Sequence, residues 1–173
     1  MYGQHECIRQ RPLEQSVLRR GLGQFPTGVT IVTTREPRTK APIGLAVSSF
    51  NSLSLSPPLI LWSIGLSSSS LGAFRAHDYF AVNILAEDQE DLCNIFARSG
   101  GDKFRGVEYD NGVSDVPLLR GAAAQFECKT VSRYAAGDHE LYIGEVVSLS
   151  NAMKAPLVFH GGGFKRLSQM PAE

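Results

Sequence analysis

Three short segments of small polar residues have the chemistry to bind a phosphorylated cofactor, because hydroxyl and backbone N–H groups can hold a phosphate without a lysine. They are Pro26-Thr27-Gly28, Ser48-Ser49-Phe50-Asn51, and the four serines Ser67 to Ser70. Each segment lies where a strand is expected to begin or end. Taken alone, each is typical of caps and turns, so the functional argument depends on their occurring together and in order.

The sequence lacks the fingerprints of the large nucleotide-binding and hydrolase classes. It contains no GxGxxG after a strand, no GxxxxGKS/T and no GxSxG, and the missing nucleophile elbow disfavours a Ser/His/Asp triad. The glycine run Gly161-Gly162-Gly163 lies between two predicted strands and is interpreted as a turn. His5, His77, His139 and His160 have no HExxH spacing and no cysteine pair beside them, so no metal site is expected.

The elements that must position these residues are mostly strands. Strands are expected over 29–34, 43–47, 59–64, 79–85, 122–134, 140–149, 157–160 and 164–167, helices over 13–25, 71–77 and 87–98, and a polar connection over 52–58. Several consecutive strands have connections too short for a parallel crossover. The pattern therefore predicts a mainly β fold, an antiparallel Greek-key barrel with a few capping helices.

Composition limits the class of protein. The 173 residues are 43% hydrophobic and carry a formal net charge of zero, which fits one globular domain and argues against nucleic-acid or membrane partners. The N-terminal residues lack the apolar stretch of a signal peptide, and Cys7, Cys93 and Cys128 form no CxxC pair. We expect a cytoplasmic protein with reduced thiols. The expected organisation is a flexible N-terminus over 1–12, one domain over 13–168 and a tail over 169–173.

A family resemblance emerges from motifs in register. The string from Leu22 to Thr34, LGQFPTGVTIVTT, resembles the opening of the short-chain flavin reductases, the small component of two-component flavin-dependent monooxygenases. The family's later motifs follow in order over nearly all of 14–167, as Gly44–Phe50, Ser54–Leu59, Phe80–Leu85, Lys103-Phe104, Gly137-Asp138-His139 and Pro156-Leu157. Any one of these motifs is weak, whereas seven in register are specific.

The resemblance implies a split β-barrel that binds FMN or FAD, forms a homodimer and is reduced by NADH or NADPH. It implies a flavin reductase that releases reduced flavin to a partner monooxygenase. By similarity the catalytic residue is His139, placed where the nicotinamide approaches. The implied flavin-binding residues are Thr27, Ser48, Ser49, Phe50 and Asn51 around the ribityl chain and ring, Ser67, Ser68 and Ser69 at the phosphate, and Lys103 and Phe104 closing over the cofactor.

The sequence also departs from the family pattern. Many relatives carry an asparagine, arginine or lysine just before the serines, where this chain has Gly65-Leu66. The hairpin from Glu36 to Pro42 is unusually charged, and Tyr109 stands where a tryptophan is common. These departures leave the choice between FMN and FAD open. No basic cluster suited to a 2′-phosphate stands out, which favours NADH.

Two other functions remain compatible with the same fold, and a third, binding of a pyridoxal-type phosphate on a related barrel, is less favoured because the expected basic residues around the phosphate are not evident. One is a flavin-dependent oxidase or oxygenase that retains its flavin and acts on an organic substrate. The other is a non-enzymatic FMN-binding protein. Retained colour on purification would indicate the first, and flavin binding without loss of NADH absorbance would indicate the second.

The position of His139 generates a kinetic prediction. His139→Ala should raise the apparent KM for NADH more than the apparent KM for flavin, because the imidazole is expected to contact the nicotinamide alone. Steady-state kinetics with each substrate varied in turn measures both constants. Equal effects on the two constants would remove His139 from the nicotinamide role.

Overall fold

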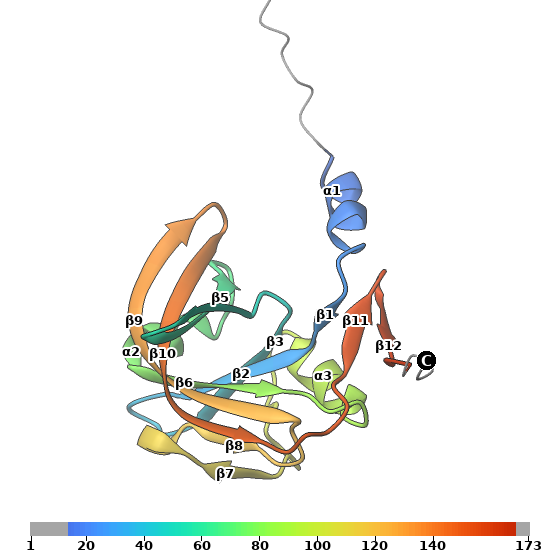
Figure 1. Cartoon of the computed structure of the whole chain (residues 1–173). Coiled ribbons are helices and arrows are strands. Elements are labelled where there is room, and N and C mark those ends of the chain that lie inside the picture. The colour runs from blue at the N-terminus through green and yellow to red at the C-terminus, as the bar shows by residue number, and fades with distance from the viewer. Residues whose placement is uncertain (1–13, 169–173) are drawn as a thin grey trace, which may run out of the picture.

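The computed structural model describes residues 14–168 (Figure 1). The expected N-terminal segment 1–12 and tail 169–173 lie outside the described residues. In chain order the elements are α1 (Gln15–Leu22), β1 (Thr27–Gly28), β2 (Thr30–Arg35), β3 (Pro42–Val47), β4 (Asn51–Leu55), β5 (Pro58–Gly65), α2 (Leu71–Ala76), β6 (Tyr79–Ile84), α3 (Glu90–Ala97), β7 (Tyr109–Asn111), a 3₁₀ turn (Val113–Asp115), β8 (Pro117–Leu119), β9 (Ala124–Ala136), β10 (His139–Asn151), β11 (Val158–His160) and β12 (Gly163–Lys165).

Seven strands form one antiparallel sheet in the order β3-β2-β6-β9-β10-β5-β4. The neighbours β2–β6 and β10–β5 are far apart in sequence, which is the long-connection pattern of a Greek key. Two smaller sheets, β1-β11-β12 and β7-β8, extend this framework. The predicted mainly β, antiparallel fold with few helices is confirmed.

Three local predictions were wrong. The expected polar connection 52–58 contains β4, which pairs with β5 although most of its side chains are exposed. The segment before Leu119, where no strand is expected, forms the β7–β8 pair. Helix α1 ends at Leu22, because Gly23 caps it three residues before Pro26. Backbone pairing without a buried face explains the first difference, while β7 and β8 are only three residues each, too short to show an alternating pattern.

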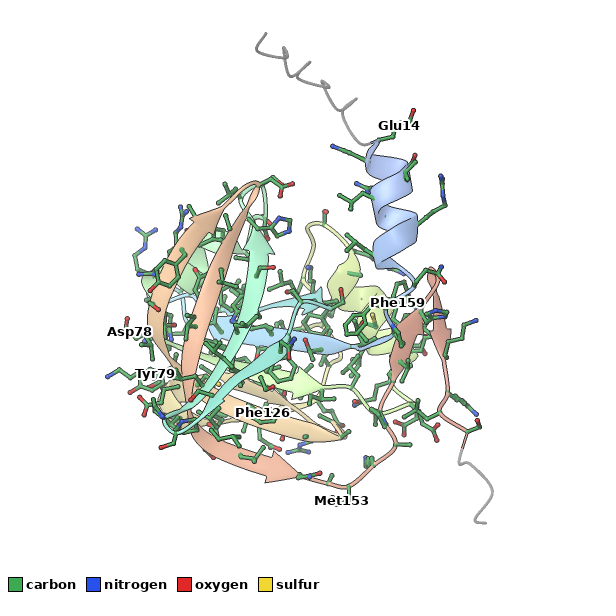
Figure 2. The ribbon with its side chains drawn as sticks, turned by 45° about the horizontal axis from the view of Figure 1, so that its top comes forward. Glu14, Asp78, Tyr79, Phe126, Met153 and Phe159 are labelled. Atoms are coloured by element: carbon green, nitrogen blue, oxygen red, sulfur yellow. The ribbon has the colours of Figure 1, made fainter. Side chains whose placement is uncertain are left out.

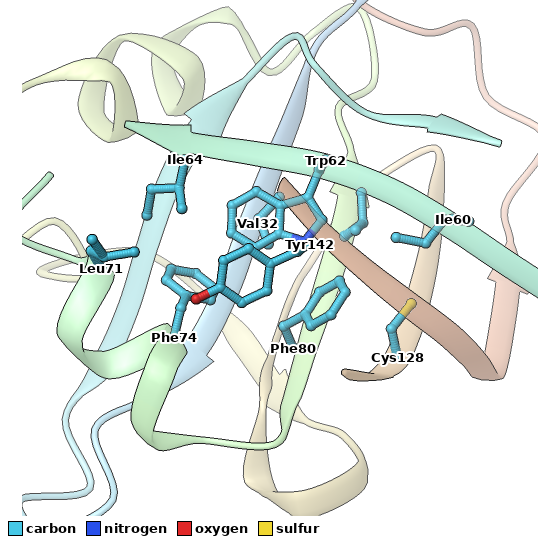
Figure 3. Close-up of a cluster of buried hydrophobic side chains, with 10 residues drawn as sticks. Val32, Ile60, Trp62, Ile64, Leu71, Phe74, Phe80, Cys128 and Tyr142 are labelled. Atoms are coloured by element: carbon cyan, nitrogen blue, oxygen red, sulfur yellow. The ribbon is translucent and has the colours of Figure 1, made fainter. Parts of the chain in front are cut away.

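One core cluster lies inside the curled sheet (Figure 3). The rings of Trp62 and Tyr142 stack with their centroids 4.8 Å apart, and Phe74 of α2 meets Trp62 edge-on at 5.0 Å. Phe80 of β6 fills the space beneath β10, where a Cβ at Gly144 would collide with its ring. Strand β10 can therefore cross over β6 only because residue 144 is glycine.

A second core cluster supports the outer side of β3. Phe96 of α3 and Phe104 pack edge to face with their ring centroids 5.0 Å apart. A Cβ on Gly44 of β3 would lie 2.7 Å from the Phe96 ring, so α3 sits directly against the strand backbone. This packing sets the distance between β3 and the loop that follows α3.

One side chain joins β5 to the turn that follows β3. The Ser49 hydroxyl donates to the carbonyl oxygen of Ser63 at 3.2 Å and accepts from the Ser63 N–H at 3.0 Å. We call this pair the Ser49 clasp. It connects two strands that are not hydrogen-bonded neighbours in the sheet order, and it holds the end of β3 close to β5.

The Ser49 clasp generates a stability prediction. Ser49→Ala should lower the free energy of unfolding by about 1 kcal/mol, because the half-buried backbone groups of Ser63 lose both partners. Ser48→Ala is the matched control, since Ser48 is exposed and makes no side-chain hydrogen bond within residues 14–168; its effect should stay within about 0.5 kcal/mol. Urea unfolding measures both variants. Equal stabilities for the two would contradict a structural role for the clasp.

Candidate functional site

A groove runs along the free edge of β3. We call it the β3 groove: it is lined by residues within 41–48, by Ser67–Ser70 and by residues within 96–104. Its two main sections each enclose about 520 Å³ and share Ser69, Ser70, Gly100 and Lys103. A third section of about 400 Å³, lined by Ser48 and Phe159, continues it through the shared residues Ala46 and Ala97.

The backbone of β3 offers hydrogen-bonding groups to this groove. The carbonyl oxygen of Val47 faces β2, where it accepts the Thr30 hydroxyl at 3.0 Å, while the carbonyl of Gly44 faces outward to Lys103. Backbone groups alternate in direction along an antiparallel strand. The N–H and C=O groups of Ala46 therefore point away from β2, toward the groove.

The serine segment forms a tight turn between β5 and α2. The Ser68 N–H donates to the Gly65 carbonyl at 3.0 Å, and the Ser68 hydroxyl accepts from the Ser70 N–H at 3.3 Å. Ser67, Ser68 and Ser69 all line the β3 groove. All three predicted phosphate-binding residues thus line the groove.

Lys103 and Phe104 lie across the groove from β3. The Lys103 ammonium donates to the carbonyl oxygens of Phe96 at 3.0 Å and Gly44 at 3.4 Å, and burial lowers the pKa of its amine. Phe104 is buried against Phe96 and Tyr109 and contributes to the groove at one end. Both side chains therefore have structural contacts in addition to their predicted place at the cofactor.

Arg98 is a groove residue that the sequence reasoning missed. It follows α3 and lines the same section as Ser67–Ser70 and Lys103. The sequence analysis considered a basic group only at the position just before the serines. The basic group that the fold places beside them is Arg98, 28 residues after Ser70. The available signal was the pair of basic residues Arg98 and Lys103 flanking a glycine-rich loop.

His139 lines none of the groove sections itself but lies next to Gly65, which does. His139 is the first residue of β10 and pairs with Gly65, while the Leu66 N–H donates to the Asp138 carbonyl at 2.9 Å. Its Nδ1 lies 2.7 Å from the Asp138 carboxylate, and its side chain is 49% exposed. The hydrogen bond from His139 lowers the pKa of the Asp138 carboxyl. The imidazole is thus oriented and accessible.

Four predicted residues have other surroundings. Thr27 pairs with Phe159 in β11, next to the third section of the groove. Ser49 is engaged in the clasp, the Phe50 ring packs toward Phe126 at 5.6 Å, and Asn51 is exposed at the start of β4. Their role at a cofactor stays a prediction, and for Ser49 and Phe50 it would have to involve backbone groups.

The groove has the donor set that a flavin phosphate requires. It combines apolar walls at Leu45 and Phe96 with serine hydroxyls, outward backbone groups and the cations of Arg98 and Lys103. Within residues 14–168 no group of three His, Cys, Asp or Glu side chains is arranged to hold a metal. No helix of this described part is long and apolar enough to cross a membrane.

The chain is similar to proteins named as flavin reductases. The chain is 42% identical over 151 residues to the FMN reductase (NADH) SmoA of Agrobacterium fabrum, covering 87% of this chain and 85% of that protein. It is 41% identical to the reductase component of the flavin-dependent trigonelline monooxygenase of Acinetobacter baylyi, covering 85% of this chain and 47% of the relative.

A solved structure shows the same architecture. The NADH:FAD oxidoreductase SgcE6 of Streptomyces globisporus, in complex with NAD and FAD fragments, superposes with a TM-score of 0.86 at 36% identity, covering 92% of this chain and 96% of that one. The sequence profile described as flavin reductase like domain matches residues 22–168. This chain belongs to the flavin reductase-like family.

Proposed function

We propose that this protein is an NADH-dependent flavin reductase that reduces FMN or FAD and supplies the reduced flavin to a monooxygenase. The observation that carries the proposal is the β3 groove, where outward backbone groups of β3 face a serine turn and two cations. Relatives named as an FMN reductase (NADH), an NADH-dependent FAD reductase and a monooxygenase reductase component support it.

The bound flavin would supply the redox chemistry, by accepting a hydride from the nicotinamide. The hydroxyls of Ser67 and Ser69, with the Arg98 guanidinium, would hold the phosphate at one end of the groove. The backbone N–H groups of Ala46 and Ser48 would donate to the polar edge of the ring and stabilise negative charge there.

Lys103 would act indirectly, by holding a loop in place, and His139 would act at the second substrate, the nicotinamide cofactor. The Lys103 ammonium, bonded to the carbonyls of Gly44 and Phe96, holds the loop after α3 against β3. His139, oriented by Asp138 beside the groove, would position the nicotinamide. Neither role needs a proton transfer, which fits hydride chemistry between two cofactors.

We also propose that the protein is cytoplasmic. Cys93 and Cys128 are both free and buried, and burial raises the pKa of the Cys128 thiol to about 12. Inert thiols packed as small apolar groups are typical of a reducing compartment.

The reductase activity is tested by mixing the purified protein with NADH and either FMN or FAD. We expect NADH absorbance to fall only when flavin is added, over many turnovers, with flavin that exchanges freely on dilution. A protein that purifies yellow and keeps its flavin through dilution would support the oxidase or oxygenase alternative. Flavin binding with unchanged NADH absorbance would leave a non-enzymatic binding protein and contradict the proposal.

We also propose that the protein is a homodimer, because two apolar surfaces lie outside the core. Helix α1 has no buried residue and projects from the sheet with Val17, Leu18 and Leu22 exposed (Figures 1 and 2). On the sheet, Leu55 of β4 is 94% exposed, and Val147 and Leu149 of β10 are also exposed. Exposed apolar groups of this extent are typical of protein interfaces.

Light scattering tests the dimer. The wild-type mass should be twice 18.8 kDa, and Leu55→Lys should shift the population toward the single-chain mass, because a charge would be buried in the interface. The exposed Leu167, outside both surfaces, provides the control Leu167→Lys, which should leave the mass unchanged. A single-chain mass for the wild type would contradict the proposed dimer.

A further inference from the structure

The serine turn of the β3 groove and the neighbouring His139 come from segments that are far apart in sequence. The serine turn leads directly into α2, while His139 begins β10. One ion pair joins these two elements: Arg75 in the last turn of α2 and Glu140, the residue after His139. The Arg75 Nη2 lies 2.6 Å from the Glu140 Oε2, and Nε lies 3.1 Å and 3.3 Å from the two carboxylate oxygens.

The geometry of this pair is that of a specific contact. The Glu140 side chain is only 10% exposed, whereas that of Arg75 is 50% exposed. Because two guanidinium nitrogens of Arg75 bond to the same carboxylate, the contact fixes the relative orientation of the two side chains as well as their separation. Arg75 lowers the pKa of the Glu140 carboxyl, so the carboxylate stays ionised at neutral pH.

The ion pair completes a ring of contacts. Gly65 pairs with His139, and the Leu66 N–H donates to the Asp138 carbonyl at 2.9 Å. The chain then runs through the serine turn, where the Leu71 N–H donates to the Ser68 carbonyl at 3.1 Å, and into α2. The Arg75–Glu140 contact returns from the end of α2 to β10.

Few other polar contacts hold the end of α2. The helix has six residues, of which Leu71 and Phe74 are buried, and a helix of that length does not persist by itself. Arg133 of β9 donates to the Arg75 carbonyl at 2.9 Å, and its guanidinium lies 6.0 Å from the Tyr142 ring centroid. The end of α2 is thus held by the hydrogen bond from Arg133 and by the ion pair of Arg75 with Glu140.

We propose that Arg75 and Glu140 are positioning residues for the reductase: the pair holds the serine turn and His139 at one separation, so that the groups proposed to bind the phosphate and the nicotinamide stay in place together. The inference rests on the proposed function. Neither Arg75 nor Glu140 lines the groove, so the proposal gives both an indirect role through the serine turn and His139. Loss of the pair should weaken binding of both flavin and nicotinamide while leaving the core intact.

The test variant is Glu140→Gln, which keeps the shape of the side chain and removes its charge. We expect KM for both NADH and flavin to rise by about threefold, with a smaller change in kcat, because binding geometry and not the hydride step is affected. We also expect the amide hydrogens of Leu66 and Leu71 to exchange about tenfold faster with solvent. Arg75→Lys, which keeps the charge with a single donor group, should fall between wild type and Glu140→Gln.

A matched control is available on another part of the surface. Arg120 and Asp110 form a pair with the same fork geometry and the same 2.6 Å distance, joining the β7–β8 region outside the β3 groove. Asp110→Asn should leave both KM values and the exchange at Leu66 unchanged.

Two results would overturn the inference: unchanged KM and exchange in Glu140→Gln, or equal changes in Glu140→Gln and Asp110→Asn. If the wild type fails to reduce flavin, the proposed function fails separately. The exchange comparison then still decides whether the ion pair holds the serine turn beside His139.

Discussion

The unpaired edge of β3 is the constraint on which the rest of the structure depends. β3 ends the seven-stranded sheet on one side, so alternate backbone groups along it have no strand partner. A free edge of this kind is a liability unless it is covered. Here the Lys103 ammonium donates to the Gly44 carbonyl, and Phe96 of α3 packs against the strand. The remaining outward backbone groups face the β3 groove.

The two core clusters hold the segments around that edge in place. Trp62, Tyr142 and Phe80 hold β5, β10 and β6 in a curl, and the Ser49 clasp joins the end of β3 to β5 without strand pairing. Phe96 and Phe104 set the position of the loop that carries Arg98 and Lys103. The groove is thus lined by segments that rest on two well-packed clusters, and this arrangement suits a ligand that must enter and leave.

Much of the fold was predictable from local sequence. β-branched and alternating residues marked β2, β3, β5, β6 and the long hairpin β9–β10, because these strands bury one or both faces. Strand β4 was missed because its serines alternate with exposed leucines and prolines follow directly. Its pairing depends on the neighbouring strand and not on a buried face of its own.

The candidate site was predictable only in part, for a similar reason. The serine turn, Lys103 and His139 stood out by residue type; the fold brings the first two to one groove and places His139 beside Gly65, a residue of its lining. The partner of Ser49 is a backbone group 14 residues away, and the place of Arg98 beside the serines depends on how α3 packs on β3. Such relations are tertiary, so local patterns do not contain them.

The central claim, that flavin binds along the free edge of β3, is tested most directly by titrating FMN into isotopically labelled protein and following backbone amide resonances. The account predicts that the resonances of Ala46, Ser48, Ser67, Ser69 and Arg98 shift with one common dissociation constant. Those of β7 and β8, which line none of the groove, should stay in place. Saturable shifts confined to β7 and β8, or to any surface away from β3, would contradict it.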